Sequence, residues 1–168
     1  MAFTIYDASV PVFIRMLSNL AAILQKGAAS AEARGIDPVV LTGARLAPDM
    51  FPLTRQVQIA CDAAKGGAAR LAGVEAPRHP DVETSFPDLQ ARIDTTIAFL
   101  NGITAAQLEG AETRSIAMKM QGVDFTFTGQ VFLLNLAMPN FYFHISTAYD
   151  ILRHNGVAVG KRDLLGGV

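Results

Sequence analysis

The chain has 168 residues, of which 51% are hydrophobic and 17% are charged, and its formal net charge is −1. This length suits one compact domain over residues 1–168, and the apolar content excludes a disordered chain. The charges are spread without a basic run, which argues against nucleic-acid binding. The apolar surplus indicates surface beyond one core, so we expect an oligomer interface, most simply that of a homodimer.

The sequence favours a cytoplasmic protein. Residues 1–7 (MAFTIYD) lack the positive start and apolar stretch of a secretory signal, so we do not expect export. Cys61 is the only cysteine, which excludes an internal disulfide and is typical of a small structural cysteine in a reducing compartment. The most apolar segment, residues 131–145, is interrupted by Asn135 and Pro139 and is too short and too broken to span a membrane.

The first predicted helix covers residues 6–33. Its apolar residues recur at alternating steps of three and four, which places them on one helix face: Val10, Phe13, Leu17, Leu20 and Leu24. Residues 36–49 are rich in Pro and Gly and predict a connection with one short helical turn. A second long helix is predicted to begin at Pro52, with Asp49 favouring its dipole, and Gly66–Gly67 either weakens its end or lets a neighbour approach.

Residues 73–84 are predicted to be a loop, which makes His79 a surface residue. Ser85 gives the clearest helix start, because its hydroxyl and the carboxylate of Asp88 can both satisfy free N–H groups. The apolar stripe of this third helix consists of Leu89, Ile93, Ile97 and Leu100. Residues 104–107 predict the start of one further short helix.

The apolar period becomes alternating between residues 114 and 128, which predicts a β-hairpin with its turn at Gln121–Gly122. A lone hairpin is marginal in water, so its apolar face must lie on the bundle or on a partner subunit. The last long helix is predicted over residues 128–155, with a kink at residues 135–139 and Gly156 as its terminator.

These elements predict an all-α fold, namely an antiparallel four-helix bundle with a short β-hairpin before the last long helix. The tail, residues 160–165, carries charges and two leucines and is able to dock back on the bundle.

Two polar residues interrupt the apolar seam of the last helix. Alternating steps of four and three give the seam as Leu133, Ala137, Asn140, His144, Ala148 and Ile151. Asn140 and His144 would then lie one turn apart on the buried face, where an unpaired polar group costs about 1–3 kcal/mol. Gln56, beside the apolar stripe of the second long helix, is the candidate partner. Its polar neighbours are predicted to be solvated: Arg55, Gln58 and Asp62.

This polar spot has two interpretations. Histidine is the commonest metal ligand, and ligands one turn apart on facing helices build bundle metal sites, so a ligand or metal pocket is one of them. A hydrogen-bonded core pair is the other, and the residues alone favour it, because metal sites need three good ligands and Asn is a poor one. His154 lies in the last turn of the last helix, where a partial positive charge is favoured by the helix dipole, so its presence there needs no functional explanation. Nucleophile-elbow, phosphate-loop and dinucleotide motifs are missing from the sequence.

Residues 139–153 (PNFYFHISTAYDILR), with residues 155–157 (NGV) and 160–163 (GKRD), carry a resemblance to a known family. The sequence resembles an uncharacterised family catalogued as domain of unknown function nineteen-ninety-three. Residues 49–53 (DMFPL) with Gln56 resemble that family's other characteristic stretch, and the likeness extends over nearly the whole chain.

That family is in turn similar to the DinB/YfiT-like proteins, which implies a four-helix bundle, frequent dimers and often a divalent metal held by three histidines. One of these histidines belongs to the second helix and two, spaced by four, to the last. The resemblance places Asn140 and His144 at the positions of the two histidines of the last helix, and Gln56 near the position of the histidine of the second helix. Only one of the three metal-binding histidines, His144, is therefore present. One imidazole with two amide oxygens would hold zinc or nickel weakly, so the resemblance implies a degenerate metal site.

Two functions follow from this. Relatives in the wider superfamily include thiol-dependent transferases and isomerases, so the first is a small-molecule pocket lined by Gln56, Asn140 and His144, with Tyr142 and Tyr149 nearby. His144 would be its general base or hydrogen-bond donor, and a cavity would open at this residue. The second is a non-catalytic bundle for dimerisation or protein interaction, with a closed polar seam and a large apolar interface. Whether the protein is an enzyme stays open at this point.

Overall fold

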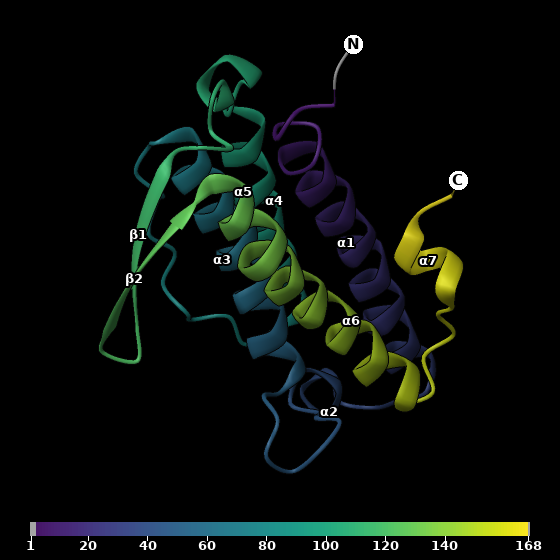
Figure 1. Cartoon of the computed structure of the whole chain (residues 1–168). Helices are drawn as coiled ribbons and strands as arrows, with labels where there is room; N and C mark the ends of the chain where they lie inside the picture. Colours follow the sequence, from purple (N-terminus) through teal and green to yellow (C-terminus); the bar gives the residue numbers. More distant parts are fainter. Residues whose placement is uncertain (1–2, 168) are drawn as a thin grey trace.

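The computed structural model describes residues 3–167 (Figure 1). Its long helical segments are α1 (Val10–Ala33), α3 (Leu53–Ala72), α4 (Phe86–Asn101) and the continuous run of α5 (Gly129–Phe132), η2 (Leu133–Ala137) and α6 (Met138–His154). The shorter elements are α2 (Pro38–Thr42), η1 (Ala105–Leu108), β1 (Ser115–Met120), β2 (Val123–Thr128) and α7 (Lys161–Leu165). The predicted helical bundle with a hairpin before the last long helix is confirmed.

The directions of the helices follow from their neighbours. α3 packs against α4 and α6, and α1 packs against the same two helices. Gly27, near the end of α1, lies beside Phe86 at the start of α4 and Leu152 near the end of α6. α3 and α4 therefore run in one direction and α1 and α6 in the opposite one, as Figure 1 shows. The connection between α3 and α4, residues 73–85, has to return along the bundle.

Local sequence signals account for several helix ends. The Asp88 N–H donates to the Ser85 hydroxyl while the Ser85 N–H donates to the Asp88 carboxylate, so the predicted capping box is present. The N–H of Thr104 donates to the side chain of Gln107 at the start of η1, where a short helix was expected. Gly156 ends α6 with a φ of +82°, a conformation that favours glycine.

Two predicted starts shift by a few residues. α1 begins at Val10 rather than near Tyr6, because Thr4 and Asp7 form a turn in which each backbone N–H donates to the other side chain. Pro52 caps α3 instead of occupying its first turn, and its φ of −69° with an extended ψ is the conformation proline prefers.

The break predicted in the last long helix takes the form of a π-helical turn. η2 occupies residues 133–137, and Pro139 follows it within the same continuous helical run, where its missing N–H removes one backbone hydrogen bond to the preceding turn. A π turn holds more residues than an α turn, so the buried seam continues from Ala137 by a step of four, and Phe141 takes the fully buried position. Asn140 is exposed. The prediction that Asn140 lies on the buried face is therefore wrong, whereas His144 does lie there.

The hairpin packs on the bundle through its base and the middle of its first strand. Ile116 pairs with Phe127 and Met118 with Phe125, which puts the apolar side chains on one face. Ile116 is buried and Phe127 packs against the core, whereas Phe125 is exposed. Figure 1 shows the tip extending away from the helices. Met118 also packs against the core, so the expected contact with the bundle is made by the base and the middle of the hairpin and not by its tip.

The tail docks back on α1 through α7. The Asn19 side chain donates to the Leu164 carbonyl over 3.0 Å, and Lys26 pairs with Asp163 over 2.6 Å. Leu164 packs against the core, as the two leucines suggested. None of the helices described over residues 3–167 has the length and apolar content needed to cross a membrane.

Replacing Gly129 by alanine should destabilise the fold strongly. A Cβ at this buried position would lie 1.8 Å from the carbonyl oxygen of Ala111, so α5 and the preceding loop would have to separate. We expect Gly129→Ala to lower the free energy of unfolding by about 1–3 kcal/mol in urea titrations followed by circular dichroism. Gly160→Ala is the matched control, since nothing lies within 4 Å of a Cβ there. Equal stability of the two variants would contradict this packing.

Candidate functional site

A hydrogen bond joins α3 to α6 at the predicted polar spot. Nδ1 of His144 lies 2.6 Å from Oε1 of Gln56, and both side chains are buried. The amide Nε2 of Gln56 donates to the carbonyl of Phe51, 3.0 Å away in the α2–α3 connection. The expectation that Gln56 is the partner of His144 agrees with this contact, which we call the Gln56–His144 pair.

The contact with Phe51 determines which nitrogen of His144 carries the proton. Because the amide N–H₂ of Gln56 is used on a carbonyl, its oxygen faces the imidazole and accepts a hydrogen bond from Nδ1–H. The neutral ring then has an unprotonated Nε2 with a free lone pair. Among the described residues, no group forms a hydrogen bond with Nε2. The atom is also not fully enclosed by the protein. It therefore meets solvent and is able to accept a hydrogen bond or a proton.

The surroundings of His144 keep the imidazole neutral. Burial lowers its pKa below the ordinary value, and the positive charge of Arg55 lowers it further. The ring of Phe143 stands edge-on to the imidazole, with the two centroids 5.1 Å apart. At neutral pH this site therefore presents a neutral acceptor beside an aromatic side chain.

The other predicted pocket residues do not converge on the imidazole. Asn140 is exposed one turn away, and Tyr142 is also exposed, with its ring against Phe141. Tyr149 is partly buried against the core. None of the hydrogen bonds of residues 3–167 connects these side chains to His144. The cavity at the start of α1 is lined by other residues, and Gln56 and His144 are both buried, so His144 belongs to a nearly closed seam with one accessible nitrogen.

The residues of this spot do not fit a three-histidine metal centre. In the part of the chain that the structure describes, no three His, Cys, Asp or Glu side chains gather as metal ligands would. The Gln56 oxygen already accepts the bond from His144, and the Asn140 side chain lies on the exposed surface. A single imidazole nitrogen remains, which is too few ligands for a stable zinc site.

A buried arginine, which the sequence analysis did not single out, holds residues 73–85 against the bundle. The side chain of Arg92 on α4 is 1% exposed, and its Nη2 lies 3.0 Å from the carboxylates of both Asp62 and Asp81. Its Nη1 lies 2.9 Å from Glu83. Arg92 with Asp62, Asp81 and Glu83, here named the Arg92 cluster, thus connects α3, α4 and the crossing segment. Its sequence signal was only an arginine one residue before the apolar Ile93.

The Arg92 cluster corrects the prediction that the polar residues of α3 are solvated. Gln58 is buried and donates to Glu83 over 2.8 Å. Arg55, which pairs with Asp81, is half-buried, and so is Asp62. Burial alone would raise the pKa of Glu83, but the hydrogen bonds from the Arg92 and Gln58 side chains hold it below its ordinary value.

Cys61 and His79 border the Arg92 cluster. Burial raises the pKa of the Cys61 thiol to about 12, so it is no nucleophile at neutral pH, in line with the structural role expected for it. His79 lies on the crossing segment as predicted, but it is half-buried and its Nδ1 is enclosed without a partner.

Comparisons with known proteins agree with this geometry. A family model described as Domain of unknown function (DUF1993) matches residues 5–165. The crystal structure of a DinB family member protein from Shewanella denitrificans is 49% identical to this chain, with a TM-score of 0.92, covering 97% of this chain and 92% of that one. None of the curated proteins matches. The resemblance inferred from residues 139–153 and 49–56 is confirmed.

Titration of His144 by NMR should give a midpoint below the ordinary value of about 6.5. Because the folded pKa is the lower one, the unfolded chain takes up the proton first as the pH falls. His144 therefore leaves stability unchanged above about pH 7 and reduces it progressively as the pH drops through 6.5 towards the folded pKa. His144→Gln lacks this contribution, so the stability of the native protein relative to the variant should decline between about pH 7 and 5. A constant difference in urea unfolding over this range would contradict the burial of a neutral imidazole.

Proposed function

We propose that this protein, which belongs to the family described as Domain of unknown function (DUF1993), is a DinB-like bundle whose polar site works without a resident metal as a small-molecule site. In this proposal Nε2 of His144 accepts a hydrogen bond or a proton from the ligand. The observation that carries it is the Gln56–His144 pair, which fixes the ring and leaves Nε2 unprotonated.

The surroundings of the imidazole support a ligand with an apolar part and a donor group. Phe51 is exposed at the carbonyl that holds Gln56, and Phe143 is 54% exposed beside the ring. Aromatic side chains beside a single polar acceptor are typical of small-molecule sites, which use few polar groups to orient the ligand. The same arrangement would suit a general base, because a lowered pKa keeps the imidazole unprotonated at neutral pH.

Restoring the missing ligands tests the metal-free proposal. Elemental analysis of the untagged protein should find no stoichiometric zinc or nickel, in the native protein or in His144→Ala. The double variant Gln56→His/Asn140→His should likewise take up no stoichiometric zinc, because the side chain at position 140 lies on the exposed surface and does not converge on His144. Stoichiometric metal in the native protein, lost in His144→Ala, would contradict the proposal.

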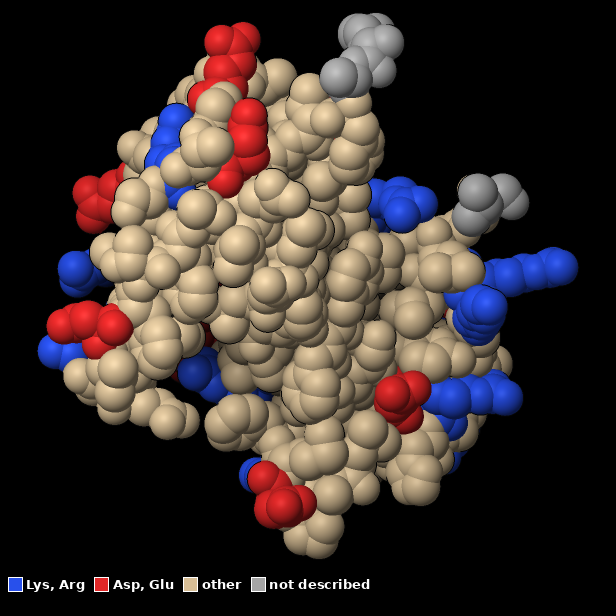
Figure 2. Space-filling view, in the orientation of Figure 1, with Lys and Arg blue, Asp and Glu red and all other residues tan. Residues whose placement is uncertain are grey.

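A second candidate function is homodimerisation through the outer face of α5, η2 and α6. This face exposes large apolar side chains, among them Val131, Leu134, Tyr142 and Phe143. Figure 2 shows a broad central area over α5 and α6 without charged residues. Exposed apolar areas of this kind mark protein contacts on soluble proteins, and a C2 dimer would bury the face against its own copy.

Light scattering at micromolar concentration should therefore give the mass of two chains. Val131→Glu introduces a charge within the proposed contact and should shift the protein to the mass of one chain. Val82→Glu is the matched control, because Val82 is exposed on the crossing segment outside this face, and it should leave the dimer intact. A monomeric mass for the native protein would exclude the dimer.

A further inference from the structure

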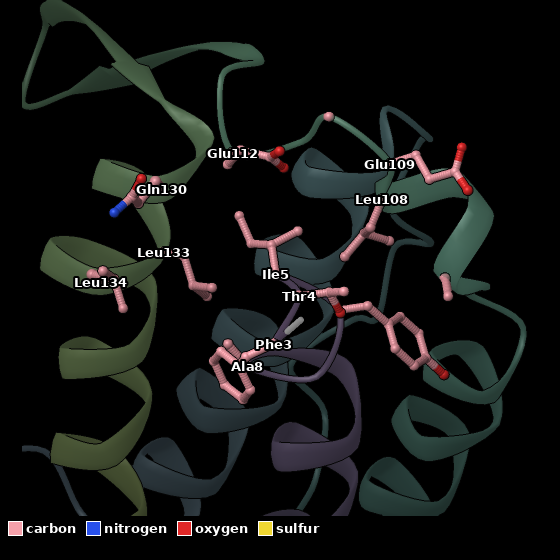
Figure 3. A pocket seen from close by; sticks show the side chains of 13 residues that line it. Phe3, Thr4, Ile5, Ala8, Leu108, Glu109, Glu112, Gln130, Leu133 and Leu134 are labelled. Carbon is pink, nitrogen blue, oxygen red and sulfur yellow. The ribbon is translucent and has the colours of Figure 1, made fainter. Parts of the chain in front are cut away.

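A second site lies at the end of the bundle where α1 begins. A half-open cavity of about 720 Å³ is bounded by three segments that are far apart in the sequence, residues 3–8, 105–112 and 130–134. Figure 3 shows Ile5, Leu108 and Leu133 around a common space, with Glu112 at its upper side and Glu109 farther out at the rim. The volume is within the range of small-molecule sites, roughly 300–1,000 Å³. His144 and Gln56 do not line it, so it is independent of the site proposed above.

The walls of this cavity are fixed by hydrogen bonds. In the N-terminal wall, Thr4 and Asp7 cap each other, and the Ser9 hydroxyl donates to the Ile5 carbonyl over 2.6 Å. The backbone N–H of Gln130 donates to the Glu112 carbonyl over 2.9 Å, which joins the other two walls. A site bounded by hydrogen-bonded turns is largely formed before a ligand arrives, so little ordering accompanies binding.

The wall next to η1 is anchored to α3. Arg114 donates to the carbonyl of Leu71 at the end of α3 and also contacts the carbonyl of Gln107. Ala111 is fully buried against Gly129, where a Cβ would not fit. The loop that carries the polar groups of the cavity therefore has a defined position.

The lining combines an apolar interior with negative charge. Ile5, Leu108 and Leu133 supply the apolar surface, and Figure 3 shows their side chains around the central space. The charged residues of the lining are Glu109 and Glu112, with no Lys, Arg or His among them. Neither carboxylate takes part in an ion pair among residues 3–167. In Figure 3 Glu112 lies across the upper side of the cavity, between Gln130 and Leu108.

We propose that this cavity binds a small organic cation, an amine or quaternary ammonium with an alkyl or aryl body. The apolar body would occupy the space between Ile5, Leu108 and Leu133, where burying its surface away from water favours binding. The ammonium group would meet the carboxylate of Glu112, with Glu109 at the rim adding negative charge, and the two carboxylates would repel an anion of the same shape. The rings of Phe3 and Tyr6, which also line the cavity, favour a cation over a neutral ligand.

The test compares octylammonium with octanoate, which have the same apolar chain and opposite charges. Calorimetric titration of the full chain should show saturable binding of octylammonium, at least about tenfold tighter than that of octanoate. Glu109→Gln/Glu112→Gln should remove most of this preference. Glu32→Gln/Glu75→Gln is the matched control, since it changes the net charge equally at exposed positions outside the cavity and should keep the preference.

A blocking variant separates binding in the cavity from binding elsewhere on the surface. Ala8→Phe places a ring in the lining of the cavity and should weaken the binding of octylammonium at least about tenfold. The circular dichroism and melting temperature of this variant should match those of the native protein. Three results would each overturn the proposal. These are equal affinity for the two probes, an unchanged preference in Glu109→Gln/Glu112→Gln, and no saturable binding of octylammonium up to millimolar concentration.

Discussion

The buried guanidinium of Arg92 is the interaction on which the arrangement of the bundle depends. Two helices that follow each other in the chain run in the same direction only if their connection returns along the bundle, and such a segment has little hydrophobic surface of its own to hold it. Arg92 supplies the missing attachment, because its two terminal nitrogens meet carboxylates from α3 and from residues 81–83. The partners keep the charge compensated, as a buried arginine requires. With the crossing segment fixed, α3 is positioned between α4 and α6.

The position of α3 in turn determines the chemistry of the candidate site. The centre of α3 is made of small residues, including Ala60, Ala64 and Gly67, and a Cβ at Gly67 would already touch Phe13 and Ala137. α6 therefore packs closely along α3, and at the first turns of α3 this brings Gln56 within hydrogen-bond reach of His144. Arg55 links the two regions, since it pairs with Asp81 in the crossing segment and also lowers the pKa of His144. The protonation state of the imidazole thus reflects contacts made at the other side of the same helix.

Sequence periodicity and capping residues were sufficient to predict the helices, the hairpin and the capping box at Ser85, because these features depend on residues close together in the chain. The side-chain positions that failed depend on long-range geometry. Asn140 was placed in the core by an α-helical count that a π turn at η2 invalidates, and no single residue type signals such a turn. Gln58 was predicted to be solvated because its partner, Glu83, belongs to a segment whose path no local pattern reveals. The cavity lined by Ile5, Leu108 and Leu133 combines three segments that are distant in the sequence, so no pattern of neighbouring residues predicts it.

The hairpin leaves the bundle and returns to it at the same place. Its register pairs Ser115 with Thr128, so the strand ends sit side by side whatever the length of the strands between them. The turn at Gln121–Gly122 lies at the far tip and uses two positive φ angles. Residues added or removed in pairs across the strands would therefore leave the spacing between η1 and α5 unaltered. The hairpin is a modular appendage, at which evolution or an engineer is free to vary length and recognition surface while the helices beneath keep their geometry.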